Sequence, residues 1–134
     1  MSTPEAPRRT RFRLARHRLK PADFTRIYRQ GRRAQGAGFT VVVLENGLPH
    51  ARLGLSVSKK HARGAVQRNR SRRILREAFR LSLAELPGGL DLVLIAAPGG
   101  PPLVLAEVRP ALLELVARAL RKKPRGPAAP VSTP

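Results

Sequence analysis

A run of arginines in residues 64–80, GAVQRNRSRRILREAFR, constrains the fold more than any other part of this chain. At roughly 100° per residue in an α-helix, arginines 68, 72, 76 and 80 (the arginine ladder) recur every four positions, with Arg73 beside them. Ile74, Leu75, Ala78 and Leu81 cluster on the opposite side. The pattern predicts a helix over residues 64–85 that packs one side against a core and offers a basic side to a polyanion.

The basic side of this helix has few acidic partners. A solvated helix face usually interleaves acidic and basic residues four positions apart, whereas here Glu77 is the one acid among the arginines from Arg68 to Arg80. Arginine also favours bidentate contacts with phosphate and stacking on bases. We therefore interpret the arginine ladder as a nucleic-acid surface rather than as a solvated helix face.

The overall charge points to the same class of partner. The chain has 27 Lys and Arg residues against 8 Asp and Glu, a formal charge of +19, which predicts binding to nucleic acid or to an anionic membrane surface. No segment approaches the roughly 18–20 continuous apolar residues that span a bilayer, so we expect no integral membrane protein. The absence of cysteine excludes disulfides and thiolate metal sites and suits a reducing compartment, by default the cytoplasm.

Hydrophobic periodicity predicts an α+β domain with elements in the order α-β-β-α-β-α. Pro21 in the first helical turn and Gly31 as a stop predict a helix over 21–30. Two β-rich segments, 39–45 and 51–58, flank the break at Asn46-Gly47 and suggest a hairpin. Residues 90–96 are nearly continuously apolar, which is typical of a buried central strand. Residues 105–120 form a last amphipathic helix, in which Pro110 fits only near the start of the regular helix.

Phe24, Ile27 and Tyr28 share one face of the first predicted helix. Such a group most often packs in a core. Arginines at 26, 29, 32 and 33 lie close by, however, and aromatic rings beside positive charge are typical of surfaces that hold single-stranded nucleic acid. Packing and nucleic-acid contact are about equally supported for Phe24, whereas contact is favoured for Tyr28 because its hydroxyl prefers a wet edge.

The segment ARLGLSVSKKHARGAVQRNRSRRILREAFR, residues 51–80, resembles the signature region of the bacterial ribonuclease P protein component. It has a strand ending in Ser-Val-Ser-Lys-Lys, followed by the Arg-Asn-Arg motif at 68–70. The resemblance extends upstream through residues 23–31 and downstream through 90–96, and covers about residues 18–121. It implies a compact single-domain α/β sandwich with a left-handed βαβ crossover that carries the Arg-Asn-Arg helix on an exposed face.

The chain ends lie outside this domain. Residues 1–17 are rich in arginine and lack the apolar region of a secretory signal. They resemble a transit peptide only in composition, and we favour a flexible arginine-rich arm that binds RNA. Residues 122–134 are rich in proline and predict a disordered tail.

The resemblance also implies two kinds of RNA contact. The catalytic RNA subunit is expected to contact the basic strand end and helix, at Lys59, Lys60, Arg68, Asn69, Arg70, Arg72, Arg73, Arg76 and Arg80. The 5′ leader of precursor tRNA is expected in a cleft formed by Phe24, Tyr28, Ser56 and Ser58. Some family members place a further aromatic residue near the position of Val42, where this chain has no ring to offer a third stacking contact. Asn69 is also suited to a local contact within its helix.

Protein-based chemistry has little support in the sequence. The three histidines are scattered, no residues have metal-ligand spacing, and no nucleophile motif is present. Glu77 and Asp91 are the acids that most suggest catalysis, but an acid on a helix beside arginines, such as Glu77, is better explained as an ion-pair partner. We therefore expect no catalytic or metal-binding residues. The family implies that the RNA subunit is the catalyst, with Mg²⁺ held mainly by RNA, and that the protein positions precursor tRNA, with no DNA or membrane partner expected.

Two other functions fit the same features less well. A structural basic protein of the ribosome or of chromatin would use the arginine ladder for nonspecific binding. An autonomous nuclease is the weaker alternative, because the chain offers no catalytic constellation.

Overall fold

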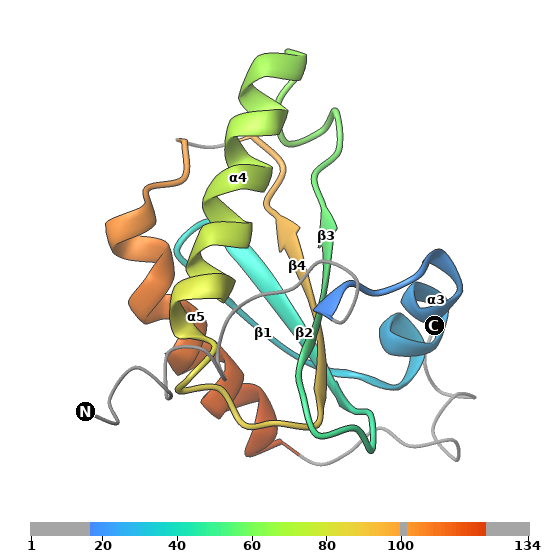
Figure 1. Ribbon diagram of the computed structural model, residues 1–134. Coiled ribbons are helices and arrows are strands. Elements are labelled where there is room, and N and C mark those ends of the chain that lie inside the picture. The colour runs from blue at the N-terminus through green and yellow to red at the C-terminus, as the bar shows by residue number, and fades with distance from the viewer. Residues whose placement is uncertain (1–16, 100–101, 123–134) are drawn as a thin grey trace.

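The structure is a computed structural model that describes residues 17–99 and 102–122. The order of elements is α3 (Pro21–Gln30), β1 (Arg32–Gly36), β2 (Phe39–Glu45), β3 (Arg52–Ser56), α4 (Ala65–Ser82), β4 (Leu90–Ala96) and α5 (Leu105–Leu120). Figure 1 shows α4 and α5 on one face of the sheet and α3 on the other. The predicted α+β sandwich is confirmed. The predicted arm and tail lie outside the described residues, except for His17 and Lys122.

The sheet has the strand order β1-β2-β4-β3. β2 pairs antiparallel with β1 and with β4, whereas β3 pairs parallel with β4 and forms an edge. β4 is almost entirely buried, as its apolar sequence predicted. Helix α4 connects the parallel neighbours β3 and β4, as expected for a crossover, and its left hand stays a prediction.

The predicted hairpin between residues 39–45 and 51–58 is wrong. The turn at Asn46-Gly47 does reverse the chain, but β4 lies between β2 and β3 and pairs with both. The most apolar strand takes the central position because both of its faces are then covered. The hairpin of this sheet joins β2 to β1, a strand that the sequence analysis did not predict. The sequence of β1, RRAQG, is too polar for the usual strand signal, although Arg32 and Ala34 are buried on one side.

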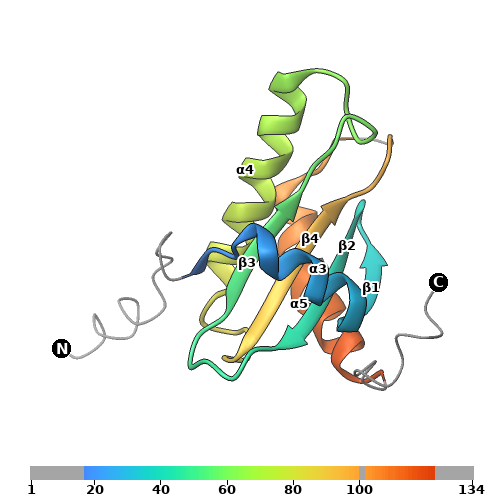
Figure 2. The same cartoon turned by 90° about the vertical axis from the view of Figure 1, so that its right-hand side faces the viewer.

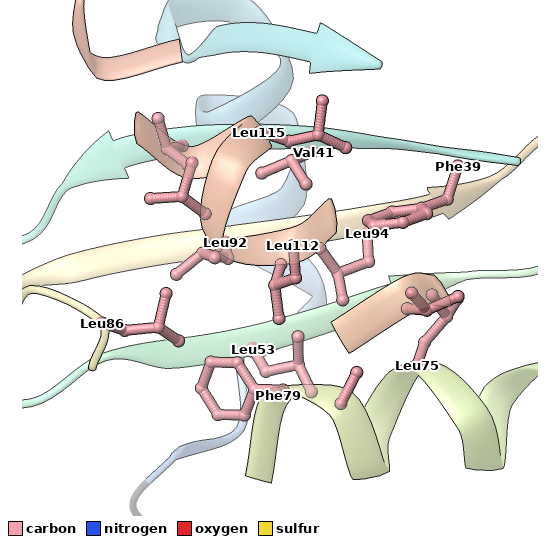
Figure 3. Packing of buried hydrophobic residues seen from close by; sticks show 14 of the residues in the cluster. Phe39, Val41, Leu53, Leu75, Phe79, Leu86, Leu92, Leu94, Leu112 and Leu115 are labelled. Atoms are coloured by element: carbon pink, nitrogen blue, oxygen red, sulfur yellow. The ribbon is translucent and has the colours of Figure 1, made fainter. Parts of the chain in front are cut away.

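The main core lies between the sheet and the two helices α4 and α5 (Figure 3). Leu75, Phe79, Leu112 and Leu115 from the helices are essentially inaccessible to solvent. The inward residues of the strands, among them Val41, Leu53 and Leu94, pack against these helices. Helix α5 is amphipathic, as its sequence predicted: it buries Val108, Leu112, Leu115, Val116 and Ala119, and Pro110 lies on its exposed side.

The buried side of α4 is not the predicted one: it is rotated about the helix axis towards the side that carries the arginine ladder. Leu75 and Ala78 are buried as expected, but Ile74 and Leu81 are only half-buried, and Phe79 is fully buried. On a helical wheel Phe79 falls between Arg68 and Arg72. The ladder therefore begins at the edge of the core and, because four residues turn the helix by about 400°, moves outward by roughly 40° with each arginine.

Helix α3 covers the other face of the sheet through a smaller core. Leu19, Ile27, Val42 and Val93 are buried there, with Phe24, Tyr28, Leu44 and Ile95 packed around them. Figure 2 shows α3 crossing in front of the strands, with α4 and α5 behind them. Val42 is therefore a core residue under α3, not a surface residue.

Candidate RNA interface

A groove with a volume of about 810 Å³ opens between α3 and α4 at strand β3. Arg18 and Phe24 form part of its wall on the α3 side, and Arg72 and Arg76 face them from α4. The remaining lining residues are Leu19, Pro21, Leu53, Gly54 and Leu55. None of the described residues that line it is a carboxylate, so the groove combines an aromatic ring with positive charge, the combination typical of single-stranded nucleic-acid sites.

Gly54 sets the position of the Phe24 ring. A Cβ atom at residue 54 would lie 2.5 Å from Cζ of Phe24 and 3.1 Å from Cδ1 of Leu19, both too close for an unperturbed structure. The absence of a side chain thus allows Phe24 to rest directly on the strand. The ring is half-buried and still lines the groove.

We expect Gly54→Ala to lower the free energy of unfolding by about 1–3 kcal/mol, because an overpacked core must shift side chains or backbone. Urea denaturation measures this change. Gly36→Ala is the matched control, since its Cβ would meet the nearest side chain, Leu115, at an ordinary 3.5 Å. Equal stability of the two variants would show that Phe24 is not confined by Gly54.

The four ladder arginines differ in what they contact. Arg68 donates from Nη1 to the carbonyls of Ala62 (3.0 Å) and Arg63 (2.6 Å). Arg72 donates from Nη2 to the carbonyl of Val57 (3.3 Å), so its guanidinium bridges α4 and the end of β3. Arg76 is exposed in the groove. Because the ladder moves outward along the helix, its first two members are partly used within the protein.

The outer end of the ladder carries an ion pair. Arg80 donates to Glu77 at 2.5 Å, as predicted for this acid. The hydrogen bond from Arg80 is the main cause that lowers the pKa of Glu77. Arg70 and Arg73 are exposed, whereas Asn69 accepts a hydrogen bond at Oδ1 from Nη1 of Arg72 (2.9 Å). The local helix contact considered for Asn69 is therefore present.

The residues predicted for the leader cleft are only partly brought together. The ring of Tyr28 lies 6.0 Å from that of Phe24, and the guanidinium of Arg33 lies 5.8 Å from the Tyr28 ring centroid. Ser56 shares the α3 side of β3 with Gly54, by the alternation of the strand. Ser58 lies beyond the end of the strand, where its hydroxyl accepts a hydrogen bond from the backbone N–H of Lys60 (3.2 Å).

Lys59 and Lys60 lie in a second, more open pocket of about 850 Å³. Its other lining residues are His61, Ala62, Arg63, Pro98 and Gly99. The buried His61 holds this loop in place. In its neutral form the ring donates from Nδ1 to the carbonyl of Ala97 (2.7 Å) and accepts at Nε2 from the hydroxyl of Ser71 (2.7 Å).

Sequence reasoning missed two cations of these pockets. Arg63 lines the lysine pocket and Arg18 lines the groove. Arg63 directly follows the Lys-Lys-His-Ala segment, so its position in the loop was a usable signal. Arg18 stands at the predicted start of the folded domain, and its place beside Phe24 depends on a bridge to Leu53 on β3.

Asp91 on β4 ties α3 to the sheet. Its fully buried carboxylate accepts hydrogen bonds from Arg52 on β3 (2.8 Å to each oxygen), from Arg26 on α3 (2.9 Å) and from the Asn46 side chain (2.8 Å). Asp23, near the start of α3, lies 3.4 Å from Arg26 and 3.9 Å from Arg52. Two aspartates and two arginines thus form a neutral, closed network that orients the helix carrying Phe24 and Tyr28.

The network predicts how stability depends on pH. Burial alone would raise the pKa of Asp91, but hydrogen bonds from Arg52, Asn46 and Arg26 outweigh burial and lower it below the ordinary value. A carboxyl with a lowered folded-state pKa stabilises the fold above its unfolded pKa, about 4, and loses this contribution as pH falls through the folded value. We expect the stability difference between the wild type and Asp91→Asn to be constant from pH 7 to about 5 and to shrink in more acidic solution. Urea denaturation as a function of pH measures it, and a difference that grows on acidification would contradict the expectation.

Within the described residues, no group of three or more His, Asp or Glu side chains is arranged to hold a metal ion. No helix in the described part of the chain is long and apolar enough to cross a membrane.

Comparisons with known proteins identify the family of this chain. A family profile described as Ribonuclease P matches residues 13–120. The ribonuclease P protein component of Desulfotalea psychrophila is 44% identical over 93 residues, covering 64% of this chain and 77% of that protein. A Staphylococcus aureus RNase P protein, solved as a mutant with defective mRNA degradation activity, superimposes with a TM-score of 0.67 at 30% identity, covering 80% of this chain and 91% of the other. The RNase P protein of Thermotoga maritima superimposes with a TM-score of 0.61 at 29% identity, covering 84% and 97%. This chain therefore belongs to the family of bacterial ribonuclease P protein components.

Proposed function

We propose that this chain binds the catalytic RNA of ribonuclease P and the 5′ leader of precursor tRNA, and so assists removal of the leader. The observation that carries the proposal is the groove, where Phe24 on α3 faces Arg72 and Arg76 on α4. The ring offers a stacking surface, and the guanidiniums can bind the phosphates on either side of a stacked base. A single strand of RNA fits this combination better than a duplex does.

The two RNAs share the basic surface in this proposal, and Arg72 and Arg76 lie where the two binding regions meet. The leader lies in the groove against Phe24, with Tyr28, Ser56 and Ser58 along its path. The catalytic RNA contacts the outer surface of α4 and the lysine pocket, through Lys59, Lys60, Asn69, Arg70, Arg72, Arg73, Arg76 and Arg80. Arg68 contributes indirectly to this surface. Its hydrogen bonds to the carbonyls of Ala62 and Arg63 fix the loop that carries Lys59 and Lys60.

The chemistry of hydrolysis belongs to the RNA subunit in this proposal. Mg²⁺ bound by RNA supplies metal-ion catalysis, and the protein contributes positive charge that offsets repulsion between two polyanions. The protein thereby lowers the Mg²⁺ concentration that the reaction needs. We place the holoenzyme in the cytoplasm, with catalytic RNA and precursor tRNA as partners and no role in binding DNA.

A cleavage assay at low Mg²⁺ tests this function. Precursor tRNA is incubated with the cognate catalytic RNA, with and without the full chain. We expect cleavage at the leader junction to be stimulated by the protein and absent with protein alone. No stimulation would favour a structural basic protein, and cleavage by the protein alone would favour an autonomous nuclease.

Tyr28→Ala should weaken binding of the holoenzyme to leader-bearing precursor by roughly 5-fold to 100-fold, the range for losing one base–aromatic stack. Binding to mature tRNA should change little, because mature tRNA has no leader to stack. Fluorescence titration of both RNAs under conditions that block cleavage gives the two dissociation constants. Tyr28→Phe is the control, since it keeps the ring, and equal losses for both RNAs would identify Tyr28 as a structural residue.

A further inference from the structure

A cavity of about 130 Å³ lies between helix α4 and the segment that follows β4. Its walls include His61, Gln67, Arg70, Ser71, Ile74 and Leu103. On a helical wheel, the four lining residues that belong to α4 centre about 170° from Arg72 and Arg76, which line the groove. The cavity therefore opens on the flank of α4 opposite to the groove.

The buried residues His61 and Ser71 form the floor of this cavity and give it a fixed hydrogen-bond polarity. The carbonyl of Ala97 can only accept, so the neutral His61 ring carries its proton on Nδ1 and donates to that carbonyl (2.7 Å). Nε2 is then the acceptor for the Ser71 hydroxyl, which donates its single proton (2.7 Å). The Ser71 oxygen keeps only lone pairs for a further partner. The floor thus accepts a hydrogen bond from a ligand and donates none.

The mouth of the cavity is polar and positively charged. Gln67 and Arg70 are exposed there, and neither side chain has a hydrogen bond or ion pair among the described residues. Leu103 is buried and Ile74 half-buried, so both add apolar wall. None of the described lining residues is acidic. An exposed cation, apolar walls and an inner acceptor match the phosphate, the flat ring and the amino group of a nucleotide.

We propose that this cavity holds one unpaired base of the catalytic RNA, turned out of its strand, and recognises it by an exocyclic amino group. The amino group of adenine, cytosine or guanine donates to the Ser71 oxygen, and the ring lies against Ile74 and Leu103. Arg70 binds the phosphate of the same nucleotide at the mouth. Uracil carries no amino group and is not accepted.

The volume and the charge favour a single nucleotide over a segment of another protein. A volume of about 130 Å³ corresponds to roughly four water molecules at about 30 Å³ each, which is room for a flat ring system but not for a folded segment. Arg70 and the neighbouring Arg73 are exposed, which favours a partner with a phosphate backbone.

The inference rests on the proposed function, because it takes the catalytic RNA as the source of the base. That RNA is assigned to the outer surface of α4, and Arg70 belongs both to this surface and to the mouth of the cavity. The leader of precursor tRNA is assigned to the groove on the opposite flank. A strand that crosses the outer surface of α4 therefore reaches the cavity, whereas the leader does not.

The experiment removes amino groups from the RNA and leaves the protein intact. Three pools of catalytic RNA carry, at random positions, purine riboside for adenosine, inosine for guanosine or pyrimidin-2-one riboside for cytidine, and each substitute lacks the amino group of the base that it replaces. The full chain binds each pool, and the frequency of the substitute at every position is compared between bound and unbound RNA. We expect one position at which the substitute is depleted roughly 3-fold to 10-fold in the bound RNA, the scale of one lost hydrogen bond.

Ser71→Ala links this depletion to the floor of the cavity. The variant removes the acceptor oxygen and introduces a residue that suits a helix, so the depletion at that position should disappear. Ser82→Ala is the matched control, because Ser82 is also buried on α4, its hydroxyl has no hydrogen-bond partner among the described residues, and it does not line the cavity. The depletion should remain in this control.

A second variant tests the cavity without changing its polar floor. Ile74→Phe places a ring at a half-buried position of the wall and fills the space, so it should abolish the depletion and weaken binding of the catalytic RNA by a similar factor. Leu48→Phe adds the same ring at an exposed position between β2 and β3 and should change neither. Circular dichroism checks that each variant is folded.

The outcomes separate the two proposals. A depletion that is lost in Ser71→Ala and Ile74→Phe and kept in both controls is the expected result. If the chain binds the catalytic RNA but no depletion depends on Ser71 or Ile74, the base pocket is overturned and the proposed function stands. If equivalent pools of precursor tRNA, rather than of catalytic RNA, show the Ser71-dependent depletion, the assignment to the catalytic RNA is overturned. If the chain does not bind the catalytic RNA at all, the proposed function itself fails.

Discussion

Replacing Asp91 with alanine should lower the free energy of unfolding by about 3–5 kcal/mol, the usual cost of removing one partner from a buried ionic network. The carboxylate is fully buried and receives hydrogen bonds from Arg52, Arg26 and Asn46. Its loss leaves donors from three separate segments without their common acceptor. Since small domains are stable by only about 5–15 kcal/mol, the variant should be close to unfolding at physiological temperature. Urea denaturation monitored by circular dichroism measures the change.

The control for this variant is Glu114→Ala on α5. Glu114 is exposed and pairs with Arg118 at 3.4 Å, so its removal should change stability little. A similarly small change for Asp91→Ala would show that the network does not hold α3 to the sheet.

Replacing both Arg72 and Arg76 with glutamine should weaken binding to the RNA subunit by roughly 100-fold or more, because each charge-assisted hydrogen bond contributes about 1.5–3 kcal/mol. Each lost phosphate contact should also reduce by about one the slope of log K against log salt concentration. Filter binding from 50 to 400 mM salt, a range of about 0.9 log units, gives both quantities. The two residues are chosen because they belong to the proposed contact with the RNA subunit and lie where it borders the groove.

Arg118→Gln with Arg121→Gln is the matched control for the charge change. Both arginines are exposed, and they lie on and directly after α5, the helix that covers the face of the sheet opposite α3 (Figure 1). This pair should leave the slope nearly unchanged. An equal slope change in both double variants would mean that the RNA responds to net charge rather than to the ladder.

The elements with strong local signals could be predicted from sequence. Helix α3 has Pro21 in its first turn and Gly31 at its end, and both bounds are confirmed. Strand β4 and helix α5 follow continuous and periodic apolar patterns, which depend on few neighbours. Strand β1 could not be predicted in this way, because its polar residues are held by long-range partners. Arg32 donates to Glu45 (2.6 Å) and to the carbonyls of Leu120 (3.0 Å) and Lys122 (3.1 Å).

The candidate site also combines features that the local sequence predicts with features that depend on long-range contacts. The residue types of the arginine ladder and of the aromatic pair are visible in the sequence, since helical spacing places them on common faces. Which of these arginines form hydrogen bonds within the protein cannot be predicted, because it depends on the backbone carbonyls that the fold brings near each guanidinium. Arg68 donates to the carbonyls of Ala62 and Arg63, whereas Arg76 contacts no carbonyl of the described residues and lines the groove.

The sequence by itself determined the family, the polyanionic class of partner and the amphipathic character of α4, because charge and periodicity are properties of the chain. Only the tertiary structure decided that β4 separates β2 from β3, that Gly54 seats Phe24, and that two arginines of the ladder face this ring. Strand order and side-chain contacts depend on residues far apart in sequence, and no local pattern encodes them. The ladder is therefore not one uniform surface: its first arginine holds a loop, its second bridges a strand, its third lines the groove and its last pairs with Glu77.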